Sequence, residues 1–148
     1  MTQMKHPLVS LTLVTLQFAL IGILLLVLDL SLNTVVLAIQ IAAIMIGLWA
    51  VQSMHLGHFN IVPDPMPDIQ LVTHGPYQFI RHPMYFSIVL FFLPLVVLNL
   101  NWVNLTLYAN LVIVLIIKLT YEEHLLVERL EDYQIYQKVT KRLIPFVF

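Results

Sequence analysis

The sequence contains no cysteine among its 148 residues. This absence excludes disulfide bonds, a catalytic thiolate and zinc–thiolate sites, and it removes the usual indication of redox compartment. Charged residues are also scarce, at 10% of the chain, whereas soluble domains have roughly a quarter. A chain with so few charges and 60% hydrophobic residues cannot cover a water-facing surface, so we expect a membrane protein.

The few charges are nearly balanced in sign. Seven Lys and Arg residues against eight Asp and Glu residues give a formal net charge of −1. There is therefore no basic field to attract nucleic acid, and no run of like charges suggests an electrostatic tail. We expect no nucleic-acid partner, and the length allows one domain, covering residues 1–148.

Four apolar segments account for most of the chain. They cover residues 8–28, 35–54, 85–100 and 102–117. The first would be about 30 Å long as a helix, which matches the hydrocarbon core of a bilayer. Its only interruptions are uncharged polar residues, namely Ser10, Thr12, Thr15 and Gln17. Because short polar breaks follow the first and third segments, we expect four spanning helices in two antiparallel hairpins, with Pro94 kinking the third helix.

A polar, proline-rich segment over residues 55–83 connects the two hairpins. Closely spaced prolines exclude a regular helix, so this connection should be extended and lie at one membrane face. All seven Lys and Arg residues fall on that side of the four-span arrangement, whereas the other side has Asp29 and no basic residue. The positive-inside rule then predicts that both termini and the connection face the cytoplasm, with a bacterial inner membrane as the expected location.

Beyond residue 117 the chain becomes polar while it keeps a helical pattern. Leu126, Leu130, Tyr133 and Tyr136 recur at a spacing of three to four, which places them on one side of a helix. We therefore expect an amphipathic C-terminal helix over about residues 118–141 that continues from the fourth span and folds back against the membrane. The predicted fold class is all-α and integral membrane.

Two clusters of titratable side chains lie on the expected cytoplasmic side. One is the segment 74–85, which enters the third span and reads HGPYQFIRHPMY. The other consists of Lys118, Glu122 and Glu123, where the chain leaves the fourth span. Because the third and fourth spans form a hairpin, both clusters should end at the same membrane surface. The sequence thus predicts a polar pocket at the lipid boundary.

Each cluster also has a purely structural interpretation. Arg81 and His82, just before an apolar helix, are compatible with simple interfacial anchors. Lys118 and Glu122 are four residues apart and are compatible with a helix-surface ion pair, which contributes only about 0.2 to 0.5 kcal/mol. The residues alone leave these alternatives open.

A metal site is not predicted. The candidate ligands would be His55, His58, His74 and His124. No pair of them has the HExxH arrangement, and their spacings match no other metal motif. Any chemistry must therefore come from His, Glu, Asp, Arg, Lys or Tyr side chains or from a bound cofactor.

Four short motifs follow one another in the second half of the chain. They are His74-Gly75-Pro76-Tyr77, Arg81-His82-Pro83-x-Tyr85, Lys118-x-x-x-Glu122-Glu123 and Tyr133-x-x-Tyr136-x-x-Val139-x-x-Arg142-x-x-Pro145. In this order they resemble the isoprenylcysteine carboxyl methyltransferase and phospholipid methyltransferase group of integral membrane enzymes. Two positions depart from that pattern: Leu130-Glu131 stands where the group usually has Phe-Gly, and Lys118 stands where the isoprenylcysteine enzymes often have arginine.

The resemblance implies that S-adenosylmethionine binds in a pocket closed by the proline-rich connection and the C-terminal helix. A lipophilic acceptor, either an isoprenylcysteine-like carboxylate or a lipid, would enter from the bilayer. The residues implied in cofactor binding are His74, Gly75, Tyr77, Arg81, His82, Pro83, Tyr85, Glu123, Tyr133, Tyr136 and Arg142. Lys118 and Glu122 would form the catalytic pair beside the acceptor: Lys118 would orient a carboxylate, or Glu122 would act as a general base toward an amine or phenol.

Three other functions agree with parts of the sequence. A sterol-reductase-like enzyme that uses NADPH shares a related C-terminal architecture, but that family has more spans than this chain provides. A small transporter would have this size, yet it should carry a carboxylate inside the membrane, and the cores of the four apolar segments have none. A non-enzymatic membrane scaffold would need neither polar cluster. The sequence leaves the oligomeric state open.

Overall fold

The computed structural model describes residues 7–54 and 69–148. Within these ranges the chain is helical and contains no strand, which agrees with the expected all-α class. The elements are α1 (Pro7–Val27), α2 (Thr34–Ser53), the 3-10 helix η1 (Gly75–Gln78), α3 (Pro83–Leu98), α4 (Trp102–Arg129) and α5 (Tyr133–Val139). The predictions that concern Lys5, His55, His58 and residues 55–68 of the proline-rich connection lie outside the described residues.

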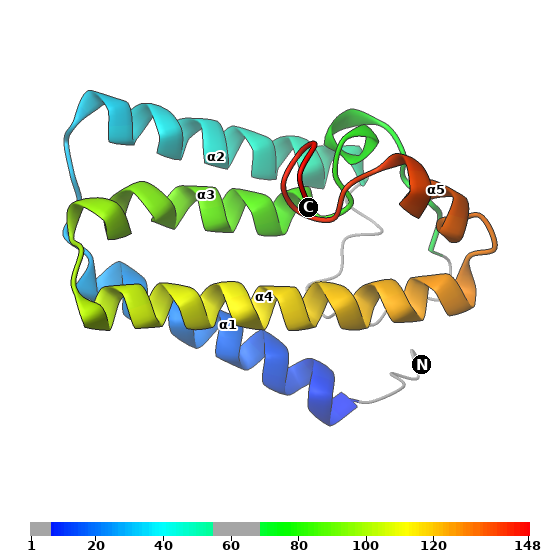
Figure 1. Ribbon diagram of the computed structural model, residues 1–148, viewed down its shortest axis with the longest axis horizontal. Helices are drawn as coiled ribbons and strands as arrows, with labels where there is room; N and C mark the ends of the chain where they lie inside the picture. The colour runs from blue at the N-terminus through cyan, green and yellow to red at the C-terminus, as the bar shows by residue number, and fades with distance from the viewer. Residues whose placement is uncertain (1–6, 55–68) are drawn as a thin grey trace.

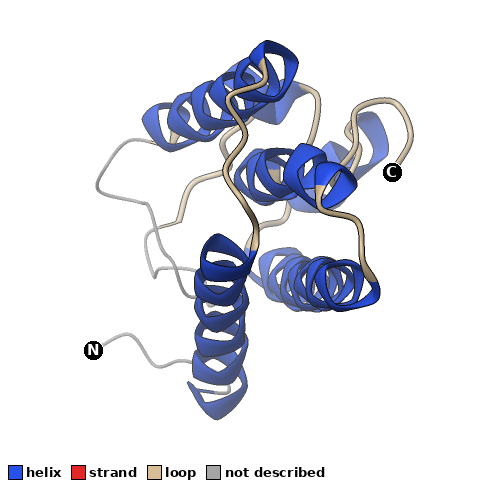
Figure 2. Cartoon of the chain, turned by 90° about the vertical axis from the view of Figure 1, so that its left-hand side faces the viewer, coloured by secondary structure: helices blue, strands red, loops and turns tan. Residues whose placement is uncertain are grey.

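The four long helices alternate in direction along the chain. The start of α1, the end of α2, the start of α3 and the polar end of α4 therefore lie at the same end of the molecule (Figure 1). Helix α2 packs along α3, and α1 packs along α4. Figure 2 shows α1 standing apart from α2. The first two helices thus follow each other as a hairpin in the chain, but the connection over residues 28–33 separates them, and each packs mainly on a helix of the second pair.

Local side chains explain where the helices begin. The Asn33 side chain accepts hydrogen bonds from the backbone N–H groups of Val35 and Val36, so it caps α2. Asn101 caps α4 in the same way by accepting from the Asn104 backbone at 2.9 Å. Helix α3 begins with Pro83, whose fixed φ and missing N–H suit the first helical position. Polar residues of the two short breaks therefore set the helix starts.

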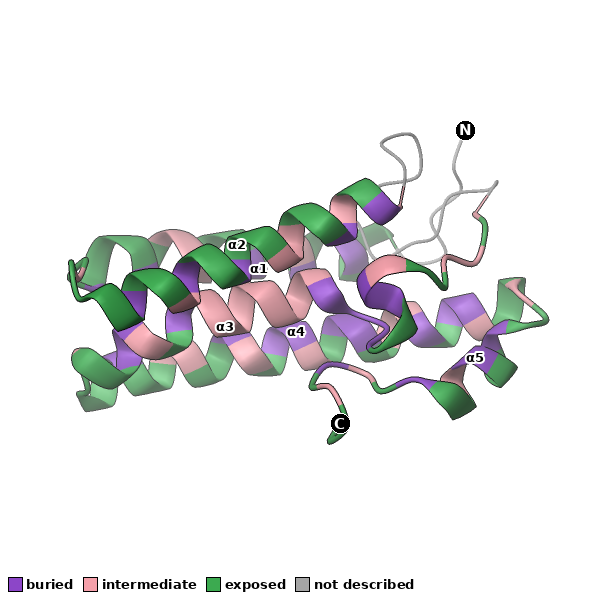
Figure 3. Cartoon of the chain, turned by 90° about the horizontal axis from the view of Figure 1, so that it is seen from above, coloured by how far each residue is buried: buried purple, intermediate pink, exposed green. Residues whose placement is uncertain are grey.

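Three of the helices, α1, α2 and α4, are long and apolar enough to cross a membrane, whereas α3 is apolar but has only 16 residues. Figure 3 shows that exposed residues line the outer sides of α1, α2 and α4. Many of these exposed side chains are large and apolar, for example Leu26 and Trp102. In water such surfaces would be unfavourable, so they are suited to contact with lipid.

The core lies where the four long helices meet. Its buried members are Leu24, Leu28, Val36, Phe92, Leu95, Val96, Leu111 and Leu115. Helices α2 and α3 approach closely at Gly47, where an added Cβ would lie 2.9 Å from Ser87 Oγ. Small residues at such contacts let membrane helices pack closely. Close packing matters because lipid supplies little hydrophobic driving force for helix association.

The C-terminal segment differs from the single helix expected over residues 118–141. Helix α4 runs on to Arg129, the chain becomes extended at Leu130, and α5 begins at Tyr133. Figure 1 shows α5 turned back from the end of α4. The break allows Tyr133 and Tyr136 to pack against Leu126 in a small core of their own, which a straight helix would not permit.

Candidate functional site

The first turn of the site depends on a glycine. Gly75 opens η1 with φ +62°, a conformation that residues with a side chain rarely adopt. It also lies directly against the end of α2, where an added Cβ would collide with the Ser53 side chain. Gly75 thus shapes the backbone of the site. Its backbone conformation and its closeness to Ser53 are geometric reasons for a glycine at this position of the motif.

Three backbone hydrogen bonds join the segment before α3 to the segment after α5. The Arg81 N–H donates to the Lys141 carbonyl at 2.8 Å, and the His82 N–H donates to the Arg142 carbonyl at 3.0 Å. The Lys141 N–H donates in turn to the Phe79 carbonyl at 3.2 Å. This short parallel pairing aligns Arg81 and His82 with Arg142, although about 60 residues separate them in the chain.

The carboxylate of Glu123 is the centre of a buried ionic network. Arg81 Nε donates to Glu123 Oε1 at 2.6 Å, and His82 Nε2 lies 3.2 Å from the same oxygen. Arg142 Nε approaches the second oxygen, Oε2, at 3.2 Å. The side chains of Arg81, His82 and Glu123 are all nearly inaccessible to solvent. Burial of these charges is favourable only because they are paired, so the network acts as a unit.

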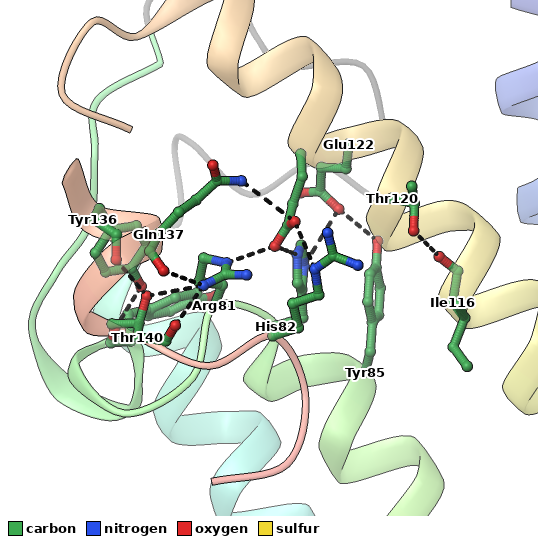
Figure 4. Close-up of polar contacts among 12 residues, drawn as sticks. Arg81, His82, Tyr85, Ile116, Thr120, Glu122, Tyr136, Gln137 and Thr140 are labelled. Carbon is green, nitrogen blue, oxygen red and sulfur yellow. Dashed lines mark hydrogen bonds and ion pairs between the residues drawn. The ribbon is translucent and has the colours of Figure 1, made fainter. Parts of the chain in front are cut away.

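Arg81 also fastens α5 to the network (Figure 4). Its guanidinium donates to the backbone carbonyls of Thr140 at 2.6 Å and Gln137 at 3.2 Å. Gln137 lies in the last turn of α5 and Thr140 is its C-cap, where carbonyls lack a partner within the helix, so a cation satisfies them well. One side chain thereby connects the start of α3, the polar end of α4 and α5.

A second group of side chains lies next to this network and involves residues of α3 and α4. Tyr85 Oη donates to Glu122 Oε2 at 2.9 Å, and the Tyr85 ring stacks on the His82 ring with centroids 5.4 Å apart. Figure 4 shows Tyr85 and Glu122 pointing toward one another. Lys118 Nζ lies 5.2 Å from the centroid of the Tyr85 ring, within the range of a cation–π contact. His82 therefore links the two groups.

Lys118 is not part of a helix-surface ion pair, which was one interpretation of its spacing from Glu122. Its side chain is fully buried, and Nζ donates a 2.7 Å hydrogen bond to Gln17 Oε1 of α1. The sequence prediction missed Gln17 as a site residue. The available signal was a long polar side chain within an otherwise apolar run, a position where such groups usually have a buried partner.

Three tyrosines from the motifs lie close to the ionic network, namely Tyr77 of η1 and Tyr133 and Tyr136 of α5. Tyr136 Oη donates to the Tyr77 carbonyl, which ties α5 to η1. Burial raises the pKa of the Tyr77, Tyr133 and Tyr136 phenols well above the usual range, so all three remain neutral. The Tyr77 hydroxyl is buried, and it has no hydrogen-bond partner among the residues that the structure describes. A buried hydroxyl of this kind is suited to a ligand contact.

All but one of the predicted site residues fall into three sets. Arg81, His82, Glu123 and Arg142 share the ionic network, and Tyr85, Glu122 and Lys118 adjoin it. Gly75, Pro83, Tyr77, Tyr133 and Tyr136 shape the backbone or pack behind it, whereas His74 is exposed just before η1. In residues 7–54 and 69–148, no group of three or more His, Asp or Glu side chains is arranged to hold a metal ion.

A comparison with known protein families identifies a match. The family model described as phospholipid methyltransferase matches residues 18–132, which is more than three quarters of the chain. The matched range contains the whole of α2, α3 and α4, and with them Arg81, His82, Lys118, Glu122 and Glu123. It ends before α5 and Arg142. No curated protein matches the sequence.

Proposed function

Because the chain belongs to the phospholipid methyltransferase family, we propose that it transfers a methyl group from S-adenosylmethionine to a lipophilic acceptor at the cytoplasmic face of a membrane. The observation that carries this proposal is the buried network around Glu123. It lies at the polar end of apolar helices, with Lys118, Tyr85 and Glu122 beside it on the membrane side. A polar cofactor and a lipid-soluble acceptor need such a boundary.

The side chains that border the network fit the chemistry of S-adenosylmethionine. Arg142 keeps 40% of its side chain exposed and Glu122 keeps 29%, so groups of both charges are accessible at the rim. The Arg142 guanidinium suits the carboxylate of the cofactor, whereas the Glu122 carboxylate remains available to the acceptor. The Tyr77 hydroxyl and the stacked rings of His82 and Tyr85 supply a hydrogen-bonding group and aromatic surface, which suits a sulfonium.

The cofactor supplies an already activated methyl group, so the chain needs no covalent nucleophile. Its own residues would bind and orient both reactants, and correct positioning alone contributes up to about 7 to 11 kcal/mol to catalysis. The Glu123 network fixes the C-terminal segment over the start of α3. Lys118 and Glu122 would then border the acceptor, with Lys118 orienting a carboxylate or Glu122 accepting a proton from an amine or phenol.

We further propose that α3 crosses the membrane as well, which gives four spans. Its 16 residues reach about 24 Å as a helix, a little less than the hydrocarbon thickness. In support, α3 lies alongside α2 and α4 and shares their length of the bundle (Figure 1). The basic residues of the described chain all occur at or beyond the polar ends of α3 and α4, and the positive-inside rule places this end in the cytoplasm.

Helix α5 would then lie at the cytoplasmic membrane surface. One side of this helix is buried through Tyr133 and Tyr136, while Ile135 and Val139 are exposed apolar residues on the other side. Exposed apolar groups beside Lys138 are typical of a segment at the lipid headgroups. In this proposal α5 would take the place of the longer amphipathic helix expected over residues 118–141.

Binding of S-adenosylhomocysteine tests the proposed cofactor. Purified protein in detergent should bind this product by calorimetry, whereas NADPH should give no heat of binding. Replacing Arg142 by Met should weaken the affinity by about tenfold or more, the usual effect of losing a hydrogen bond to a charged group. Lys138→Met, on the exposed surface of α5, is the matched control and should bind like the parent. A folded parent protein that binds NADPH, or neither compound, would refute the proposal.

A further inference from the structure

Lys118 contacts α1 through Gln17 as well as α3 through the Tyr85 ring. The hydrogen bond from Lys118 Nζ to Gln17 Oε1 joins residues that are 101 positions apart. Both side chains are buried, with Gln17 only 5% exposed. A buried ammonium and a buried amide are each unfavourable without a partner, so their contact stabilises both positions.

The contact with Gln17 is the first in a series of side-chain contacts. The Lys118 ammonium also lies over the face of the Tyr85 ring, and the Tyr85 hydroxyl donates to the Glu122 carboxylate. Both residues proposed to border the acceptor, Lys118 and Glu122, therefore touch Tyr85.

The chemistry of glutamine suits this task. Lysine has a flexible stem of four methylene groups, so its ammonium needs external contacts to stay in one place. The Gln17 amide oxygen accepts a hydrogen bond from the ammonium but brings no net charge. It can therefore hold Lys118 without cancelling the positive charge that would orient an anionic acceptor.

We infer that Gln17 is a positioning residue of the acceptor site, which fixes the Lys118 ammonium over the Tyr85 ring and makes α1 part of that site. The inference rests on the proposed methyl transfer. It extends the site to a residue that the family match does not include, because that match begins at residue 18.

Kinetics of an apolar variant test the inference. Gln17→Leu should lower kcat/KM for the acceptor by about tenfold or more, because the ammonium loses its fixed position. The affinity for S-adenosylhomocysteine should stay at the parent value. In a Lys118→Met background the same replacement should have no further effect on kcat/KM, since Gln17 acts through Lys118. The control is Thr15→Leu, an exposed position on α1 that should leave kcat/KM unchanged.

Thermal unfolding of the same variants in detergent gives a readout that is independent of activity. Gln17→Leu leaves a buried ammonium without its amide partner, whereas the double variant with Lys118→Met removes both polar groups. The double variant should therefore unfold at a higher temperature than Gln17→Leu alone. Losses of stability that simply add, or a Gln17→Leu variant that is less stable but keeps full kcat/KM, would overturn the inference. Failure of the proposed function would show differently, as a parent protein that neither binds S-adenosylhomocysteine nor transfers a methyl group.

Discussion

Glu123 has the most demanding role of the residues in the site. Its two carboxylate oxygens contact side chains from the start of α3 and from the segment after α5, all within 3.2 Å. The neighbouring residue, Glu122, has a different environment, because it is partly exposed and accepts from Tyr85. Two consecutive carboxylates thus have different surroundings, and in the proposed function only Glu122 would face a reactant.

Neutralising Glu123 should destabilise the protein strongly. Glu123→Gln keeps the shape of the side chain but leaves the buried Arg81 guanidinium without its counter-charge, which typically costs about 3 to 5 kcal/mol. Denaturant or thermal unfolding in detergent measures the change. The matched control is Glu131→Gln, an exposed glutamate in the turn before α5, which should unfold like the parent. Equal stability of the two variants would contradict a central role for Glu123.

For individual residues, the sequence predicted which side chains come together but not all the atoms to which they bond. Arg81, His82 and Glu123 were expected to meet because two successive helices bring their ends together. The bonds from Arg81 to backbone carbonyls of α5 could not be predicted, since every residue carries a carbonyl and only the fold decides which one is near. The burial of Lys118 likewise depended on α1, a helix that none of the motifs includes.

Among the elements, α1 and α2 followed the sequence most closely. Their observed bounds, Pro7–Val27 and Thr34–Ser53, differ by one residue from the predicted 8–28 and 35–54. Long apolar runs that end at polar breaks leave little freedom in placing a helix. The pairing of α1 with α4, rather than with α2, was not predictable, because apolar lipid-facing surfaces carry little information about which neighbour is preferred.

The break between α4 and α5 explains one departure from the family pattern. Leu130 and Glu131 occupy positions where the resembled enzymes usually have Phe-Gly. The chain turns at this point with no residue at positive φ, since the positive values in the described residues occur only at Gly75 and Phe146. The turn therefore needs no glycine here, and α5 folds back with Leu130 and Glu131 at these positions.

Gly75 is where the backbone does require glycine. Gly75→Ala should lower stability by about 1 to 3 kcal/mol, because alanine is strained at this φ and its Cβ meets Ser53. Thermal unfolding should show a lower midpoint, and affinity for S-adenosylhomocysteine should fall as η1 shifts. Gly22→Ala is the control, since an added Cβ there has nothing within 4 Å. A Gly75→Ala variant that behaves like Gly22→Ala would contradict this role.

The whole molecule is polar at one end and apolar along its sides. The four long helices bring the ionic network, η1 and α5 to a single end, while the opposite end carries Asp29 and the asparagines that cap the helices (Figure 1). In the proposed function, a water-soluble cofactor would approach the polar end, and a lipid-soluble acceptor would reach the same site along the apolar surfaces. The membrane class was predictable from composition because so few charges cannot cover a soluble surface.

Methyl transfer in oriented membrane vesicles tests the central claim most directly. S-adenosylmethionine with a tritiated methyl group is charged and does not cross the bilayer, so it reaches only the face to which it is added. With inverted vesicles, whose cytoplasmic face is outward, we predict label in the extracted lipids or in an added farnesylated cysteine analogue. Right-side-out vesicles should remain unlabelled until they are opened with detergent. Label that appears only in intact right-side-out vesicles, or no label in either preparation of folded protein, would contradict a cytoplasmic S-adenosylmethionine-dependent methyltransferase.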